Sequence, residues 1–182
     1  MAVTSAPLRQ RLDFQRFFQG EEPIDGPMTL THRRIFIVPN RRGLMFWLLL
    51  LVQWLAAINY GNNLAFILTF LLLAIILLAM IYGYRNLSRL RLTTRKNPPV
   101  FAGEMASFEL LIENLTSLPR FSLGFKGKDI ETVRMDIPGD ERIIVTLKLN
   151  TQRRGWLDPG TITAHTEFPL GVFYAWSPLK FK

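Results

Sequence analysis

The chain has 182 residues and no cysteine, and its 22 Lys and Arg against 14 Asp and Glu give a net charge of +8. At roughly 100 to 200 residues per domain, this length allows one domain, or a small domain with an additional segment. The absence of cysteine excludes a disulfide framework, a cysteine nucleophile and a cysteine-ligated metal site. A surplus of positive charge suits a nucleic acid or an anionic membrane surface as partner, so its distribution along the chain matters.

The positive charge gathers at the two ends of one uncharged stretch. Residues 33–42 carry four Arg and no acid, and residues 85–96 carry four Arg, one Lys and no acid. No charged residue occurs in the 42 positions from 43 to 84. The rest of the chain contributes little, because residues 1–32 sum to −1 and residues 97–182 to zero.

This uncharged stretch predicts a membrane-spanning hairpin. It is about twice the ~20 residues that a helix needs to cross a bilayer core, and a cluster of turn-forming residues divides it at 59–63. We therefore predict a transmembrane helical hairpin over residues 44–84, with helices at 44–60 and 64–84. A hairpin buried in a soluble core is the alternative, but neither segment has the polar face that a soluble helix requires.

The charges also predict an orientation. Both outer ends of the hairpin are basic and its turn is uncharged, which places both termini in the cytoplasm of a bacterium and makes the chain a multi-pass protein of the inner (plasma) membrane. The residues expected to anchor the chain at the lipid surface, among anionic headgroups, are Arg33, Arg34, Arg41, Arg42, Trp47, Tyr82, Tyr84, Arg85, Arg89 and Arg91.

Residues 1–43 are predicted to form a cytoplasmic N-terminal tail and a basic juxtamembrane arm. Residues 8–18 combine Leu and Phe with Arg, so an amphipathic helix on the inner leaflet and a disordered tail both remain open. Residues 31–37 also resemble a twin-arginine export signal, which would send the rest of the chain across the membrane. No small-residue cleavage site follows and a second span returns the chain, which argues against export.

From residue 87 onward the apolar period changes to two. Alternating apolar and polar positions predict strands at residues 89–92, 107–113, 132–137 and 142–149. Turn signals separate these strands, and short strands with such spacing are typical of an immunoglobulin-like antiparallel sandwich. The predicted fold class is therefore a membrane-anchored α+β protein. In it, the transmembrane hairpin is followed by a cytoplasmic immunoglobulin-like β-sandwich over residues 85–182.

The C-terminal end of the predicted sandwich is short. Residues 97–182 fall a little below the roughly 100 residues of that architecture. The chain stops directly after an apolar stretch. One expectation is therefore a truncated sandwich with an open edge strand.

Few residues suggest catalysis or metal binding. His165 falls on the polar side of a predicted strand, where a surface histidine is expected. Asp136, Asp140 and Glu141 cluster around a Pro-Gly-Asp string, which favours a hairpin turn over a cation site. No phosphate-binding glycine loop and no serine-hydrolase elbow occurs. We predict no catalytic residue, no cofactor and no metal, so the protein is not expected to be an enzyme.

The membrane segment and the β-segment each argue against a further class of function. Gln53 and Thr69 are the only clearly polar side chains between the interfaces, whereas transport pathways usually contain ionisable groups. Nucleic acid is not expected as a partner, because the β-segment is charge-neutral and the surplus lies at the lipid surface.

Five strings resemble one protein family when they are read in order between residues 33 and 177. They are Pro-Asn-Arg-Arg-Gly-Leu at 39–44, Asn-Tyr-Gly-Asn-Asn-Leu-Ala-Phe at 59–66, Tyr-Arg-Asn-Leu at 84–87, Val-Phe-Ala-Gly-Glu at 100–104 and Phe-Pro-Leu-Gly-Val-Phe-Tyr-Ala-Trp at 168–176. The chain resembles the bacterial domain-of-unknown-function family number 58. The resemblance implies an inner-membrane anchor and a cytoplasmic β-domain, which in the family continues into a von Willebrand-A-like region. That region is absent here, so a truncated product and a short paralogue are both open.

The resemblance also implies a partner, because relatives are typically encoded beside MoxR-type AAA+ ATPases. The first functional hypothesis is accordingly a non-enzymatic membrane adaptor or scaffold that presents its β-domain to a MoxR-type ATPase or another membrane protein. The alternative is a small transport or channel component assembled from helical hairpins. An enzyme ranks third. The oligomeric state and the ligand of the sandwich do not follow from the residues.

Overall fold

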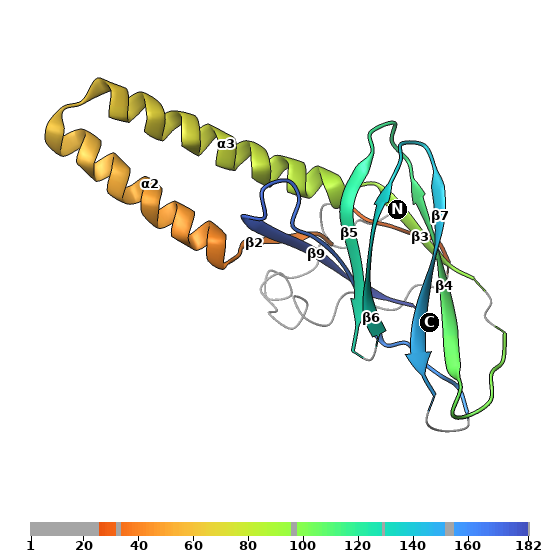
Figure 1. Cartoon of the computed structure of the whole chain (residues 1–182). Helices are drawn as coiled ribbons and strands as arrows, with labels where there is room; N and C mark the ends of the chain where they lie inside the picture. Colours follow the sequence, from red (N-terminus) through yellow and green to blue (C-terminus); the bar gives the residue numbers. More distant parts are fainter. Residues whose placement is uncertain (1–25, 32–33, 96–97, 129, 152–154, 182) are drawn as a thin grey trace, which may run out of the picture.

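The computed structural model describes residues 26–31, 34–95, 98–128, 130–151 and 155–181 of the chain (Figure 1). Within them, two helices form a hairpin that projects from a β-domain. The helices are α2 (Arg41–Tyr60) and α3 (Asn63–Leu87). The strands are β1 (Met28–Thr29), β2 (Phe36–Pro39), β3 (Leu90–Thr94), β4 (Met105–Asn114), β5 (Arg120–Gly127), β6 (Ile130–Ile137), β7 (Arg142–Asn150), β8 (Thr161–Thr166) and β9 (Phe173–Lys180).

The string at residues 59–63 ends one helix and starts the next. Gly61 takes a left-handed conformation (φ 58°) that stops α2, a position that glycine tolerates without strain. The side-chain oxygen of Asn62 then accepts hydrogen bonds from the backbone amides of Leu64 (3.0 Å) and Ala65 (3.4 Å) at the start of α3. The two helices and the turn between them are therefore confirmed, with helices that extend up to three residues beyond the predicted limits.

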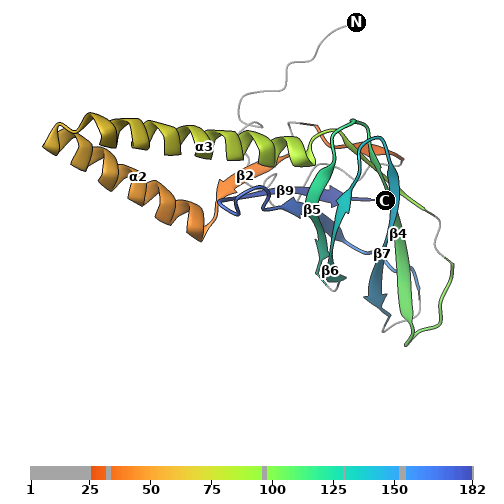
Figure 2. The ribbon, with the colours of Figure 1, turned by 45° about the horizontal axis from the view of Figure 1, so that its top comes forward.

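Both helices are long and apolar enough to cross a membrane, and most of each is exposed. They leave the β-domain as a pair, and the turn between them is the part farthest from the sheet (Figure 2). The β-domain contacts the bases of both helices and reaches about halfway along them, to Leu50 of α2 and Ile76 of α3. The last turn of α3 lies inside it, since Leu87 is fully buried.

All nine described strands belong to one antiparallel sheet in the order β1-β3-β4-β7-β6-β5-β8-β9-β2. This confirms an α+β protein with a large antiparallel β-domain. The strands form one continuous curved sheet instead of the two separate sheets expected of a sandwich. Its two halves meet at the single residue pair of Ile130 in β6 with Leu149 in β7.

Four strands coincide with predicted ones, namely β3, β4, β6 and β7. The strands β1, β2, β5 and β9 were not predicted, and β8 was expected only as a strand around His165. In β8 and β9 side chains are buried on both faces, as the consecutive residues 164–166 and 177–179 show. A strand covered on both faces does not alternate between apolar and polar residues, so it lacks the signal used for prediction.

The arm before the hairpin contributes the two edge strands of the sheet. β1 pairs with β3, and β2 pairs with β9. The sequence predicted an open edge strand at the C-terminal end of the β-domain. This strand is β9, and its first half is paired with β2. Strands that precede and follow the hairpin therefore share one sheet.

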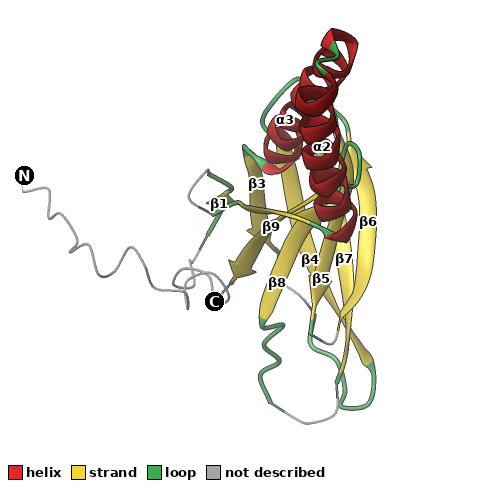
Figure 3. Cartoon of the chain, turned by 90° about the vertical axis from the view of Figure 1, so that its left-hand side faces the viewer, coloured by secondary structure: helices red, strands yellow, loops and turns green. Residues whose placement is uncertain are grey.

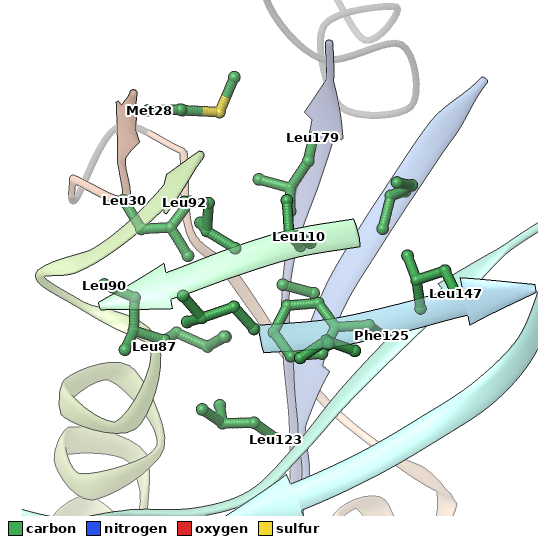
Figure 4. Packing of buried hydrophobic residues seen from close by; sticks show 14 of the residues in the cluster. Met28, Leu30, Leu87, Leu90, Leu92, Leu110, Leu123, Phe125, Leu147 and Leu179 are labelled. Carbon is green, nitrogen blue, oxygen red and sulfur yellow. The ribbon is translucent and has the colours of Figure 1, made fainter. Parts of the chain in front are cut away.

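The core lies between the two halves of the sheet and receives side chains from the arm, from the end of α3 and from the strands that follow it. Met28 and Leu30 of the arm, Leu87 of α3 and Phe125 of β5 lie together in it (Figure 4). Each is at most 3% exposed. Both flanks of the hairpin are thus held by the same core.

Candidate functional site at the helix–sheet junction

The last turn of α3 is bonded to the sheet by the buried side chain of Asn86. Its Nδ2 donates hydrogen bonds to the backbone oxygen of Phe121 (2.7 Å) and to Oγ1 of Thr166 (2.9 Å). Its Oδ1 accepts one from the backbone amide of Phe121 (3.0 Å). Asn86 is 4% exposed and Thr166 is 1% exposed. The side chain therefore pairs with both backbone groups of one residue of β5, as a neighbouring strand would.

The C-terminal end of α3 is capped by Arg120, the first residue of β5. Its guanidinium group donates hydrogen bonds to the backbone oxygens of Arg85 and of Ser88, the latter over 3.0 Å. Helices leave such terminal carbonyls without an intrahelical partner, and a cation beside them is also favoured by the helix dipole. Arg120 is 4% exposed. The pKa of Arg120 is lowered mainly by burial and, to a smaller extent, by the positive charges of Arg85 and Arg89. An arginine nevertheless remains protonated in proteins.

Asn114, at the end of β4, holds the Arg120 side chain in place. Its Oδ1 accepts a hydrogen bond from Nε of Arg120 (3.3 Å). Its Nδ2 donates to the backbone oxygens of Leu118 (2.8 Å) and Pro138 (2.9 Å) in two neighbouring turns. Asn114 is 3% exposed, so its polar atoms are satisfied by these partners instead of by water.

The start of α2 is bonded to the loop between β8 and β9. The side chain of Asn40 caps the helix by accepting from the amide of Gly43 (3.0 Å), and its Nδ2 donates to the backbone oxygen of Gly171 (2.6 Å). Its backbone amide donates to the oxygen of Val172 (3.0 Å). A Cβ on Gly43 would lie 2.2 Å from that same oxygen, so only glycine permits this approach.

The same loop also joins the two helices to each other. Val172 and Phe173 form a buried cluster with Leu50 of α2 and with Ile76 and Ala79 of α3. In Figure 1 the loop, in dark blue, lies beside α3 where β9 begins. Asn86, Arg120, Asn114, Asn40 and this loop are together called the junction below. The junction connects the bases of both helices to the sheet by buried contacts.

Several of the predicted membrane-surface residues surround this junction. Arg41, Arg42 and Trp47 are exposed in the first two turns of α2. Tyr82 and Arg85 are exposed near the end of α3, where the guanidinium carbon of Arg85 lies 5.5 Å from the ring centroid of Tyr82. These five side chains lie at the bases of the two helices.

The other predicted membrane-surface residues have different surroundings. Tyr84 is half-buried and packs against the core, and Arg34 is half-buried before β2. Arg89 is exposed in the link from α3 to β3, with a positive φ of 60°. Arg91 lies on β3 and pairs with Glu113 of β4 at 3.8 Å. Arg33 and the amphipathic stretch at residues 8–18 lie outside the described residues.

His165 is buried, so the prediction of a surface histidine is wrong. The residue is 5% exposed. Its ring occupies the space above Gly124 of β5, where a Cβ would come within 2.4 Å of the imidazole, and it stacks on Tyr174 at 5.5 Å between ring centroids. His165 lies outside the hydrophobic core cluster. Only the tertiary structure places a glycine opposite it and a tyrosine beside it.

His165 predicts a pH dependence of stability. The pKa of His165 is lowered mainly by burial and, to a smaller extent, by the positive charge of Lys126. The charge of Arg134 also lowers this pKa, whereas a hydrogen bond with the backbone of Thr163 and the charge of Glu167 raise it. As pH falls, the unfolded chain therefore binds this proton first. We expect the free energy of unfolding to decrease as pH falls through 6.5 towards the lower pKa of the folded protein.

The measurement compares two proteins, both carrying His32→Asn so that one histidine at most titrates. Denaturant unfolding between about pH 7.5 and 5 should give a smaller loss of stability in His165→Phe than in its parent. An identical loss in both proteins would contradict the assignment to His165.

The acidic cluster forms the turn that was predicted from its sequence. Asp140 has a positive φ of 56° in the turn between β6 and β7, and its amide donates to the backbone oxygen of Thr116. Asp136 accepts a hydrogen bond from the amide of Ser122 (2.7 Å). Among the residues that the structure describes, no group of three His, Asp or Glu side chains is arranged to hold a metal ion.

Comparison of the chain with protein-family models, with curated proteins and with solved structures gave no match. The junction therefore has to be interpreted from its own geometry. Asn86 and Arg120, which bond the end of α3 to the sheet, were not among the predicted site residues. Asn86 is the second residue after the predicted span, but its partners lie 35 and 80 positions away along the chain.

Proposed function

We propose that the chain is a bacterial inner-membrane protein in which α2 and α3 form a transmembrane anchor and the β-domain acts as a non-enzymatic adaptor at the cytoplasmic surface. One observation carries this proposal. A single sheet contains strands from both sides of the hairpin and is hydrogen-bonded to the bases of both helices. An anchor joined in this way gives the β-domain one orientation relative to the bilayer.

The surface of the hairpin supports the membrane assignment. Large contiguous apolar surfaces are rarely exposed by soluble monomers, for which patches beyond a few hundred Å² are unusual. Exposed Leu, Ile, Val, Phe and Trp side chains occur along the length of both helices. Each Leu, Ile or Phe near a helix centre favours membrane insertion by about 0.3–0.6 kcal/mol. A bilayer therefore removes from water a surface that the β-domain leaves uncovered.

The sheet and the charges together support the orientation. Because β2 precedes the hairpin and β3 follows it within one sheet, two crossings must return the chain to the side from which it started. The helix bases carry exposed Arg41, Arg42 and Arg85, whereas the turn between the helices is uncharged. Basic residues beside a span favour the cytoplasmic side. Both termini are accordingly assigned to the cytoplasm.

The proposed partner follows from the family resemblance and not from the geometry. In this proposal the chain belongs to the domain-of-unknown-function family number 58, and its curved sheet corresponds to the immunoglobulin-like unit. The ligand of the β-domain is then a MoxR-type AAA+ ATPase. The junction fits an adaptor because a rigid connection lets a bound partner be held at a defined distance from the membrane.

One experiment in native membranes tests the anchor and the adaptor. A topology reporter fused after Lys182 should be active only as a cytoplasmic reporter, and one inserted at Gly61 only as a periplasmic reporter. From the same membranes, affinity capture of the intact chain should recover a MoxR-type ATPase. A matched variant that lacks residues 90–182 should not recover it.

Two results would contradict the proposal separately. Periplasmic activity of the reporter after Lys182 would reverse the orientation. Equal ATPase recovery with and without residues 90–182 would remove the β-domain as the binding unit, while leaving the anchor intact.

A further inference from the structure

An apolar groove lies at the end of the sheet opposite the helices. It is a cavity of about 870 Å³ between the loop that follows β3 and the loop that joins β7 to β8. It is lined by Pro98, Pro99, Val100, Phe101, Ala102, Ala106, Ser107, Phe108, Leu149, Thr151, Gly155, Trp156, Leu157 and Pro159. Phe101 is 81% exposed and Trp156 is fully exposed, so the rim offers large aromatic surfaces to an occupant. Figure 3 shows the β7–β8 loop at the end of the sheet away from the helices.

We propose that this groove binds residues 8–18 of the same chain. The register of β1 supports this occupant. Met28 pairs with Leu92 and Thr29 with Arg91, in antiparallel fashion. Gly26 therefore lies on the Thr94 side of β1, towards the loop that forms one wall of the groove. The first described residue of the arm thus lies towards the end of the sheet that holds the groove.

The length of the N-terminal segment is sufficient. Thr94 pairs with Leu110 of β4, and the groove begins at Phe108 and Ala106 of the same strand. Those positions are two and four residues farther along β4, or about 7 and 13 Å at 3.3 Å per residue. Position 18 is eight Cα-to-Cα steps from position 26, and at about 3.3 Å per step the chain between them can span up to about 26 Å.

The composition of the segment matches the lining of the groove. Residues 8–18 contain Leu8, Leu12, Phe14, Phe17 and Phe18. The other stretches outside the described residues are at most three residues long and contain no Leu, Ile, Val or Phe. Residues 1–25 are therefore the one part of this chain, outside the described structure, that can supply apolar side chains to the groove. A bilayer around α2 and α3 does not cover it, because the groove lies at the opposite end of the sheet.

Site-directed cross-linking of the full chain in native membranes tests this proposal. The chain has no cysteine, so each introduced pair is unique. The test pair is Phe14→Cys with Val100→Cys. The control pair is Phe14→Cys with Leu118→Cys, because Leu118 is similarly exposed (48% against 39%) but lies in the turn after β4, at the helix end of the sheet. A short bismaleimide should cross-link the test pair within one chain at least about tenfold more than the control pair, because a tethered segment has a high effective concentration at its site.

A second variant keeps the test independent of the folding of the β-domain. Phe17→Asp with Phe18→Asp, added to the test pair, leaves the β-domain sequence unchanged and should reduce the cross-link to the control level. Cross-links between two chains would overturn the proposal in favour of a second copy as occupant. Equal yields for the test and control pairs would overturn it as well. So would quenching of a fluorophore at position 14 by a lipid-phase quencher, which would place the segment on the inner leaflet.

Discussion

Replacement of Arg120 by Met should lower the free energy of unfolding of the β-domain by about 3 kcal/mol or more. The substitution removes the donor to the backbone oxygens of Arg85 and Ser88, to Oγ1 of Thr116 and to the side chain of Asn114. Hydrogen bonds to a charged group contribute about 1.5–3 kcal/mol each, and an acceptor left buried without a partner adds its own desolvation cost. The end of α3 should detach from the sheet before the sheet itself unfolds.

The measurement is denaturant unfolding of the full chain in detergent, followed by tryptophan fluorescence. Arg134→Met is the matched control, because Arg134 is an exposed arginine of the same sheet and its loss should change stability by no more than about 0.5 kcal/mol. Arg120→Lys should fall between the two, since an ammonium keeps the charge but not the planar fork of donors. If Arg120→Met and Arg134→Met had equal effects, Arg120 would not be the cap of α3.

Replacement of Asn86 by Leu should lower the free energy of unfolding by about 2–4 kcal/mol. The side chain keeps a similar volume but loses both bonds to the backbone of Phe121 and the bond to Thr166. The amide and the oxygen of Phe121 then face an apolar side chain in place of their hydrogen-bond partner. The expected phenotype is a hairpin still in the membrane fraction with a β-domain that is more readily cleaved by protease.

Asn63→Leu provides the control within the same helix. Asn63 is exposed at the far end of α3, next to the turn of the hairpin. Its replacement should leave protease resistance unchanged, because it removes no described contact with the β-domain. If both variants were cleaved at the same rate, the connection of α3 to the sheet would not depend on Asn86.

These two predictions bear on the proposed adaptor function, because the junction supplies hydrogen bonds that connect the apolar helices with the sheet. Buried hydrogen bonds at both helix bases restrict rotation of the β-domain about the hairpin. A variant that loosens the junction while sparing the hairpin should therefore keep its membrane location. It should lose the defined position of the β-domain.

Local patterns accounted for the hairpin and for half of the sheet. The uncharged stretch and the Asn-Tyr-Gly-Asn-Asn turn are contiguous in sequence, so their structural consequences were predictable from residues 43–84 alone. β4 and β7 have one face in the core and one more exposed, which produces the alternation that predicts a strand. β8 and β9 lack this alternation because side chains are buried on both of their faces. β1 and β2 have two and four residues, too few for any period to be recognised.

The amino-acid sequence by itself determined that the charge of +8 lies in two basic segments around an apolar hairpin, because helix length, turn formation and charge placement depend on neighbouring residues. Only the tertiary structure decided that the arm before the hairpin completes the sheet, that His165 is buried and that Arg120 caps α3. These features depend on residues that are distant along the chain, such as Asn40 with Gly171 across 131 positions. Such pairs are selected by packing and by the need to satisfy buried polar groups, and neither leaves a periodic signal in the sequence.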